Sequence, residues 1–185
     1  MSSMPRKPEI LKRHTVARSR LFRADELLLR FSNGEERVYE KLCAGGPGAV
    51  LIVPILDDGR VVMIREYAAG IDDYHLALPK GAVDRGEEIL DAANRELKEE
   101  TGYGARDLRF LKRMHLSPAY MEHGINVILA RGLYPESLEG DEPEPIEVVP
   151  MAFDDLLELV MQDEVCEGRS IAALFYAKAW LEKHG

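Results

Sequence analysis

The sequence predicts an α/β fold in which several strands surround one helix, preceded by an N-terminal β arm. Three observations carry this prediction. Apolar runs bounded by turn residues recur through the middle of the chain, a stretch of strong helix formers without proline lies between them, and an amphipathic stretch closes the chain. At 185 residues with 46% hydrophobic content, the chain can bury a full core as one domain with an additional arm.

The N-terminal arm is predicted from a hairpin signal. Two strand-like segments, 27–32 and 37–42, flank Asn33-Gly34, whose residues accept the positive φ angles of a tight turn. A lone hairpin is only marginally stable in water, so this part of the chain must pack on something.

Composition places the boundary between the arm and the main domain. Segment 43–48 contains three glycines and a proline and is the best candidate for a linker. We therefore expect the arm at 1–45 and the main domain at 46–185. Residues 1–9, with two prolines and several charges, are expected to form a loose terminus.

The main domain is predicted to alternate strands with a few helices. Strands are expected at 49–56, 60–67, 74–78, 108–116 and 125–133, and helices at 88–101, 154–161 and 168–184. The runs at 49–56 and 60–67 are too continuous for a sheet with one wet face, so we expect both in the core sheet. The last helix is expected to bury Ile171, Leu174, Phe175, Ala177, Ala179, Trp180 and Leu181.

The helix at 88–101 places carboxylates on its own packing face. At about 100° per residue, its apolar side chains fall within one arc of roughly 160°, at Ile89, Leu90, Ala92, Ala93 and Leu97. Glu96 and Glu100 fall inside this arc, and Glu99 lies just beyond its edge. Burying unpaired carboxylates is unfavourable, so these side chains require cations nearby. The alternative is an ordinary surface helix whose glutamates pair with lysines.

Charge and cysteine content narrow the possible partners. The formal charge of −9 argues against a nucleic acid or a membrane surface as the main partner, and no apolar run approaches the length of a membrane span. The two cysteines, Cys43 and Cys166, lie far apart and make no metal spacing. Without a signal peptide, we expect free thiols and a cytoplasmic protein.

The segment from Gly81 to Tyr103 resembles the Nudix box. Gly81, Glu87 and the run Arg95-Glu-Leu-Lys-Glu-Glu-Thr-Gly-Tyr103 match its glycine, glutamate and arginine positions at the family's spacings. Tyr103 fills a position that is usually aliphatic, which is a mild departure. The resemblance implies an α/β/α sandwich with a mixed sheet and an enzyme that hydrolyses a nucleoside diphosphate linked to another group.

The resemblance also implies a set of metal ligands. Glu96 and Glu100 would be the principal ligands, and Glu99 would complete the set and take part in catalysis. Oxygen ligands of this kind suit Mg²⁺ or Mn²⁺, which would neutralise the pyrophosphate charge and activate the attacking water. The resemblance further assigns Lys80 to substrate or metal contact through its backbone, and gives Gly81, Arg95 and Glu87 supporting roles around the ligands.

Stretches outside the box are similar to the branch of the family that hydrolyses ADP compounds. They are Thr15–Phe22, Phe31–Gly34, Arg37–Glu40, Ile64–Tyr67, Ala92–Glu100 and Leu133–Pro145. The branch cleaves ADP-ribose, NADH and diadenosine polyphosphates and releases AMP from most of them. In related enzymes the N-terminal arm packs across a homodimer; the alternative is a covering sheet within one monomer.

The resemblance also bears on the general base and the substrate contacts. In related enzymes a glutamate of the loop matching 139–147 acts as the base, so Glu144 is our first choice and Glu142 the second; the alternative is a plain solvated acidic loop. Tyr39 could stack on adenine, and Glu40 and Arg65 could make polar contacts to the substrate. The alternative is that Tyr39 is an ordinary cross-strand aromatic residue and that Glu40 and Arg65 are surface charges or part of a surface ion pair.

Two departures widen the range of substrates. Ala68 and Ala77 stand where ADP-ribose pyrophosphatases usually have an arginine and a glutamate, so strict selectivity for ADP-ribose is not expected. A GDP-mannose pyrophosphatase and a non-catalytic domain that senses nucleotides are the alternative functions. The retained glutamates argue against the sensor. The sequence does not decide whether NAD-capped RNA ends are accepted.

Overall fold

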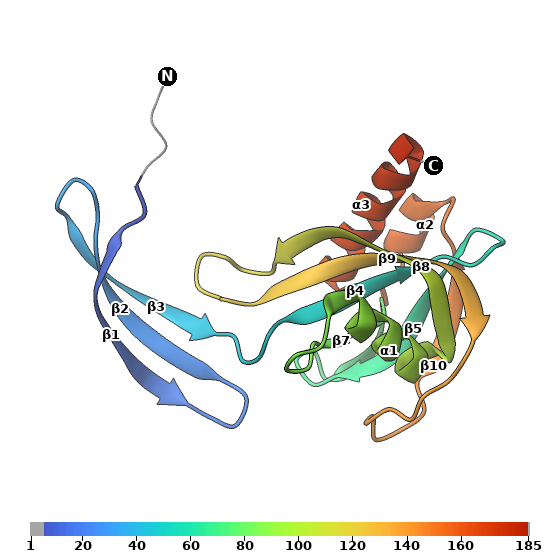
Figure 1. The fold of residues 1–185 in the computed structure, drawn as a ribbon, viewed down its shortest axis with the longest axis horizontal. Coiled ribbons are helices and arrows are strands. Elements are labelled where there is room, and N and C mark those ends of the chain that lie inside the picture. Colours follow the sequence, from blue (N-terminus) through green and yellow to red (C-terminus); the bar gives the residue numbers. More distant parts are fainter. Residues whose placement is uncertain (1–5, 185) are drawn as a thin grey trace. The chain divides into compact units, whose positions relative to one another are not determined.

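The computed structural model describes residues 6–184, which form two compact units (Figure 1). Of the described residues, unit 1 comprises 6–46 and 115–124, and unit 2 comprises 47–114 and 125–184. The loose terminus predicted for residues 1–9 lies mostly outside the described residues, and the first strand begins at Glu9.

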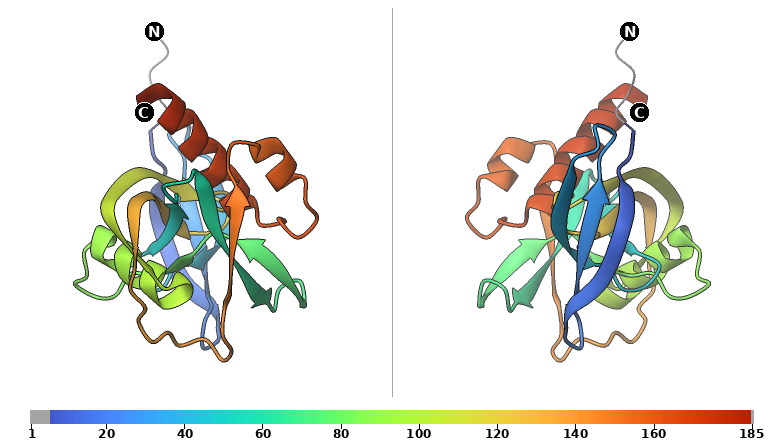
Figure 2. Two further views of the ribbon diagram at one scale, coloured as in Figure 1. Left: turned by 90° about the vertical axis from the view of Figure 1, so that its right-hand side faces the viewer. Right: turned by 90° about the vertical axis from the view of Figure 1, so that its left-hand side faces the viewer.

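Unit 1 is built on an antiparallel sheet of order β1-β2-β3, whose strands lie side by side in Figure 2. Its strands are β1 (Glu9–Arg18), β2 (Arg23–Arg30) and β3 (Glu36–Cys43). The predicted hairpin is confirmed: Gly34 adopts a φ of 85°, and its N–H donates to the carbonyl of Phe31 at 2.9 Å. The segment 115–124 joins this unit because the Leu42 N–H donates to the Tyr120 carbonyl at 2.8 Å.

Unit 2 contains a four-stranded sheet of order β7-β4-β9-β8. Its strands are β4 (Ala49–Pro54), β7 (Lys80–Ala82), β8 (Tyr103–His115) and β9 (Gly124–Pro135). Strand β4 pairs with β9 in parallel and with β7 antiparallel, so the sheet is mixed, as predicted.

A second sheet of unit 2, of order β10-β5-β6, is antiparallel throughout. It consists of β5 (Arg60–Ala68), β6 (Asp73–Ala77) and β10 (Glu147–Ala152). The prediction that the runs at 49–56 and 60–67 share one core sheet is therefore wrong. The two runs are linked by an isolated bridge between Ile55 and Val61, and their buried side chains meet in the core between the sheets.

Strand β4 shows how the layers of unit 2 are stacked. Val50 and Ile52 pack with Ala93 and Leu97 of α1 (Ile89–Thr101), whereas Leu51 and Val53 belong to the core that includes α2 (Leu156–Val160) and α3 (Gly168–His184). Because successive strand residues face opposite sides, this alternation puts α1 on one side of the sheet and α2 and α3 on the other. The predicted α/β/α sandwich is confirmed (Figure 1).

Helix α1 ends at Gly102, which adopts the left-handed conformation at φ 73° and donates its N–H to the Lys98 carbonyl. Two side chains expected in its packing face are not buried: Ile89 and Leu90 are 37% and 38% exposed. Both lie in the first turn, whereas the buried helix residues begin at Ala92.

The expected apolar face of α3 also needs correction. The buried residues of α3 are Ser170, Ala173, Leu174 and Ala177, which share one helical face by their spacing of three and four residues. Phe175 and Ala179 lie on the other side of the helix and are exposed. Helix α2 starts after Asp155, whose carboxylate accepts a hydrogen bond from the Glu158 N–H. Across residues 6–184, no helix has the length and apolarity needed to cross a membrane.

Candidate active site

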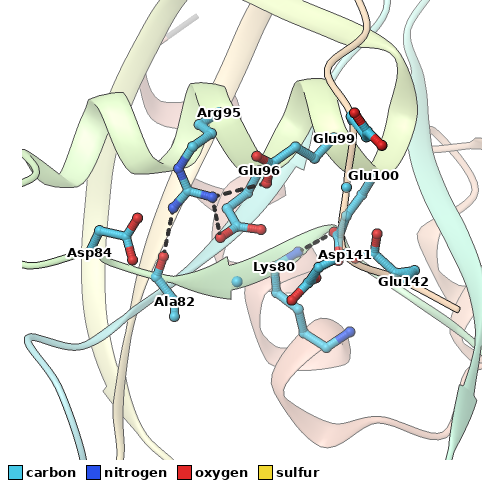
Figure 3. A pocket seen from close by; sticks show the side chains of 12 residues that line it. Lys80, Ala82, Asp84, Arg95, Glu96, Glu99, Glu100, Asp141 and Glu142 are labelled. Atoms are coloured by element: carbon cyan, nitrogen blue, oxygen red, sulfur yellow. Dashed lines mark hydrogen bonds and ion pairs between the residues drawn. The ribbon is translucent and has the colours of Figure 1, made fainter.

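A cavity of about 610 Å³ opens along α1 in unit 2 (Figure 3). Helix α1, strand β7 and the loop that precedes β10 all contribute to it. Its ionisable lining is almost wholly acidic, with Asp84, Glu96, Glu99, Glu100, Glu139, Asp141 and Glu142 facing Lys80 and Arg95. A cavity with this charge repels an anionic substrate unless cations are added.

Glu100 is the most buried carboxylate of the cavity, with only 6% of the residue exposed. Its Oε2 accepts a hydrogen bond from the Lys80 N–H at 2.7 Å. Burial raises the pKa of Glu100 to about 8, and the bond from Lys80 offsets only part of this effect. The side chain is therefore poised to exchange its proton for a metal cation near neutral pH.

Arg95 holds three glutamates around one guanidinium group. Its Nη1 donates to Glu96 Oε1 at 2.8 Å and to Glu99 Oε2 at 2.9 Å (Figure 3). Its Nε and Nη2 donate to the two carboxylate oxygens of Glu87 at 2.9 and 3.0 Å. These bonds lower the pKa of Glu87, while burial, together with the neighbouring acids, raises the pKa of Glu96.

Gly81 leaves the space that Glu96 occupies. A Cβ atom added at Gly81 would lie 1.9 Å from the Cδ of Glu96, far closer than any real contact. Strand β7 therefore approaches α1 closely only because residue 81 has no side chain. This contact explains why a glycine begins the motif that supplies the glutamates.

The loop before β10 places the two candidate bases differently. Glu142 lines the acidic cavity together with Asp141, and its charge contributes to the raised pKa of Glu96 after the larger effect of burial. Glu144 lies outside this cavity, where its Oε1 accepts a hydrogen bond from the Tyr74 hydroxyl at 2.5 Å. In this conformation Glu142, the second choice from the sequence, is the nearer of the two to the carboxylate cluster.

The donor set suits a hard divalent cation. Every ionisable ligand candidate is a carboxylate. Glu96 and Glu99 share the positive charge of Arg95. Burial of Glu100 favours the protonated form of its carboxyl group. Among residues 6–184, no three His, Cys, Asp or Glu side chains are already arranged to hold a metal ion. Glu96 and Glu99 each accept a hydrogen bond from Arg95 in this arrangement.

Two predicted substrate contacts of unit 2 already have partners. Lys80 lines the acidic cavity, and its ammonium group forms an ion pair with Glu66 of β5. The guanidinium of Arg65 donates to Glu147 at 2.7 Å and pairs with Glu164. Lys80 thus lies at the carboxylate cluster, whereas Arg65 lies outside it, between β10 and the loop after α2.

The other two predicted contacts, Tyr39 and Glu40, are exposed residues of β3 in unit 1, and their role stays a prediction. Several residues of unit 2 at or beside the cavity were not predicted as site residues, namely Glu66, Tyr74, Asp84, Glu139 and Asp141. Asp141 lay inside the acidic loop and could have been included. Glu66 and Tyr74 depend on how β5 pairs with β6, which the sequence does not reveal.

Comparison with known proteins now identifies the architecture. The NUDIX domain model matches residues 46–171, which span the sandwich and the whole acidic cavity. The chain belongs to the Nudix family. A second model, the NudE-type Nudix hydrolase N-terminal domain, matches residues 8–41 in unit 1. Nudix hydrolases generally use a divalent metal, in agreement with the carboxylate cavity.

Individual relatives cover the entire chain. It is 48% identical over 185 residues to the ADP compounds hydrolase NudE of Escherichia coli K12, covering 100% of this chain and 99% of the relative. It is 29% identical over 171 residues to the ADP-ribose pyrophosphatase of Bacillus subtilis 168, covering 90% and 92% of the two chains. A crystal structure of an ADP compounds hydrolase superposes with a TM-score of 0.91 at 47% identity, covering 100% and 99%.

Proposed function

We propose that this Nudix enzyme hydrolyses the pyrophosphate bond of ADP compounds, namely ADP-ribose, NADH and diadenosine polyphosphates, and releases AMP. The observation that carries the proposal is the full-length similarity to an ADP compounds hydrolase at 48% identity, which extends through both units. The acidic cavity supports the reaction type, since clustered carboxylates fit a diphosphate only through bridging cations.

Mg²⁺ or Mn²⁺ held by Glu96, Glu99 and Glu100 would neutralise charge on the diphosphate and lower the pKa of the attacking water. The chain itself supplies the rest of the machinery. Arg95 keeps Glu96 and Glu99 together and, through Glu87, ties them to the start of the helix. Lys80, another lining residue, holds Glu100 through its backbone N–H, and its ammonium group is paired with Glu66.

We propose Glu142 as the general base in the loop conformation seen here, because its carboxylate lines the cavity that holds the metal ligands. Glu144 remains the alternative, and it would first have to leave the hydroxyl of Tyr74. Both side chains belong to one proline-containing loop, so a change of loop conformation could exchange them.

The chain is also proposed to form a homodimer through the sheet of unit 1. Large apolar side chains of this unit are exposed, notably Leu21 at 67%, Phe22 at 62% and Val38 at 59%. Large apolar side chains left open to water are favourably covered by a protein partner. The free thiols of Cys43 and Cys166 are consistent with a reducing compartment, so we propose a cytoplasmic enzyme.

The test is a product assay with four substrates. Purified protein is incubated with ADP-ribose, NADH, diadenosine triphosphate and GDP-mannose, with Mg²⁺, with Mn²⁺ or with EDTA. The proposal expects metal-dependent AMP from the adenine substrates. GMP from GDP-mannose alone would favour the second candidate, which is suggested by 26% identity over 152 residues to a GDP-mannose pyrophosphatase of Escherichia coli. Binding without any product would indicate a nucleotide sensor.

A further inference from the structure

A second cavity of about 260 Å³ lies beside the acidic one, within unit 2. Strands β5 and β6 form one wall through Tyr67 and Tyr74, and the loop before β10 forms another through Pro143, Pro145 and Ile146. None of these five side chains has a role in the proposed hydrolysis. The cavity differs from the carboxylate site because aromatic and apolar groups line it beside its charged residues, which are Arg65, Glu66, Glu142, Glu144 and Glu147.

The two tyrosines present ring faces rather than hydroxyl groups. They are paired directly across β5 and β6, with ring centroids 5.7 Å apart and planes at 65°. The Tyr67 hydroxyl donates to Asp72 at 2.7 Å, and the Tyr74 hydroxyl donates to Glu144 at 2.5 Å. The hydroxyls are therefore engaged, yet the residues are 49% and 48% exposed. What remains open to a ligand is aromatic surface.

The facing wall is apolar and has a restricted backbone. Pro143 and Pro145 have fixed φ angles and lack backbone N–H donors, and Ile146 adds a branched aliphatic side chain. Aromatic faces opposite rigid apolar groups favour a flat, unsaturated ring over a sugar or a phosphate. The cavity is smaller than the roughly 300–1,000 Å³ of drug-sized sites, so it suits a single ring system.

Glu142 lines both cavities and so marks their common border. A molecule whose diphosphate lies over the carboxylate cluster can therefore extend past Glu142 into the aromatic cavity. Nucleotides have this layout, with a charged group joined through a sugar to a planar base. Arg65, at the edge of the same cavity, adds a cation for polar contacts.

We propose that the aromatic cavity binds a nucleobase of the substrate, stacked against Tyr67 and Tyr74. This inference rests on the proposed function and extends it, because it assigns a place to one end of the substrate. The base could come from the AMP half, which every ADP compound contains, or from the second half of a dinucleotide. ADP-ribose has no second base, so it separates the two sources.

The test compares ring removal with hydroxyl removal. Steady-state kinetics are measured for Tyr67→Leu and Tyr74→Leu, with Tyr67→Phe and Tyr74→Phe as conservative partners and Phe175→Ala as a control at an exposed aromatic of α3. The leucine variants are expected to raise KM by about tenfold or more with little change in kcat, because base stacking on an aromatic ring is lost. The phenylalanine variants and the control should retain the KM of the wild type.

The substrates then identify the base. A rise in KM for NADH and diadenosine triphosphate but not for ADP-ribose supports binding of the second base. A rise for all three supports binding of the shared adenine. Unchanged KM values for all three substrates in folded leucine variants would overturn the inference while leaving the proposed function intact. A wild-type protein inactive on all three with Mg²⁺ would overturn both.

Discussion

At the scale of single residues, the site is defined by the conflict between burial and charge at Glu100. A carboxylate this deeply buried is normally avoided, and here it has one backbone hydrogen bond instead of an ion pair. Glu96 and Glu99 resolve the same conflict by sharing Arg95. The carboxylates of the cluster are thus held by hydrogen bonds from a backbone N–H and from one guanidinium group.

Replacing Glu100 with glutamine keeps its shape and removes its charge. We expect Glu100→Gln to lower metal-dependent turnover by about three orders of magnitude or more, because a principal metal ligand is lost. The fold should survive, since the amide can still accept the Lys80 N–H. The measurement is kcat with Mg²⁺, alongside Tm. Glu88→Gln, at an exposed residue just before α1, is the matched control, and full activity of Glu100→Gln would exclude the assignment.

The pKa of Glu100 predicts how stability depends on pH. Its pKa is raised to about 8 from an ordinary value of 4.5, so the folded chain keeps a proton that the unfolded chain releases between these values. The contribution of Glu100 to stability therefore falls as pH rises from about 5 to about 8. A divalent cation binds the ionised form and should raise Tm more at pH 8.5 than at pH 6.

Calorimetry at both pH values, with Mg²⁺ and with EDTA, measures this effect. Other acidic groups also titrate, so the wild type is compared with Glu100→Gln. In this variant the rise in Tm caused by Mg²⁺ should differ less between the two pH values than it does in the wild type. If Mg²⁺ raised the Tm of the wild type equally at pH 6 and at pH 8.5, the prediction would be contradicted.

Gly81 provides a steric test. Gly81→Ala places a Cβ where the carboxylate of Glu96 lies, so the side chain or strand β7 must move. We expect kcat to fall by about a hundredfold, since displacement of a metal ligand by an ångström is costly. Gly70→Ala is the control, because a Cβ there meets no atom within 4 Å and the backbone needs no positive φ. Equal activity of the two variants would refute the steric argument.

At the scale of elements, the loop before β10 distinguishes the two proposed bases. Glu142→Gln should lower kcat by about 10²- to 10⁴-fold and leave metal binding measurable, as removal of a general base does. Glu144→Gln should have a much smaller effect if the Tyr74 hydrogen bond persists during the reaction. The reverse order of effects would assign catalysis to Glu144 and show that the loop changes conformation before chemistry.

Elements also show how far the sequence alone leads. Helix α1 was predicted within one residue because its ends depend on local signals, such as the left-handed Gly102. The carboxylate face was predicted because helical periodicity is local too. The sequence did not predict that β4 and β5 belong to two different sheets, or that Tyr67 pairs with Tyr74. Strand partners are determined by contacts between residues distant in sequence.

At the scale of the whole molecule, the exposed apolar side chains of unit 1 predict self-association. Light scattering at micromolar concentration should give the mass of a dimer. The double variant Leu21→Ser, Phe22→Ser should shift the population toward the monomer, because it removes exposed apolar area from the proposed interface. Leu157→Ser, at a 68% exposed residue of α2, should leave the mass unchanged. A monomeric wild type would contradict the homodimer.

The hydrogen bond that holds Glu100 comes from the main chain of Lys80, whereas the ammonium group of the same residue pairs with Glu66 of β5. Every amino acid except proline can supply that N–H. A different side chain at position 80 would therefore break the ion pair to Glu66 and still leave the hydrogen bond to Glu100 in place. The two contacts of this one residue can be lost or kept independently of each other.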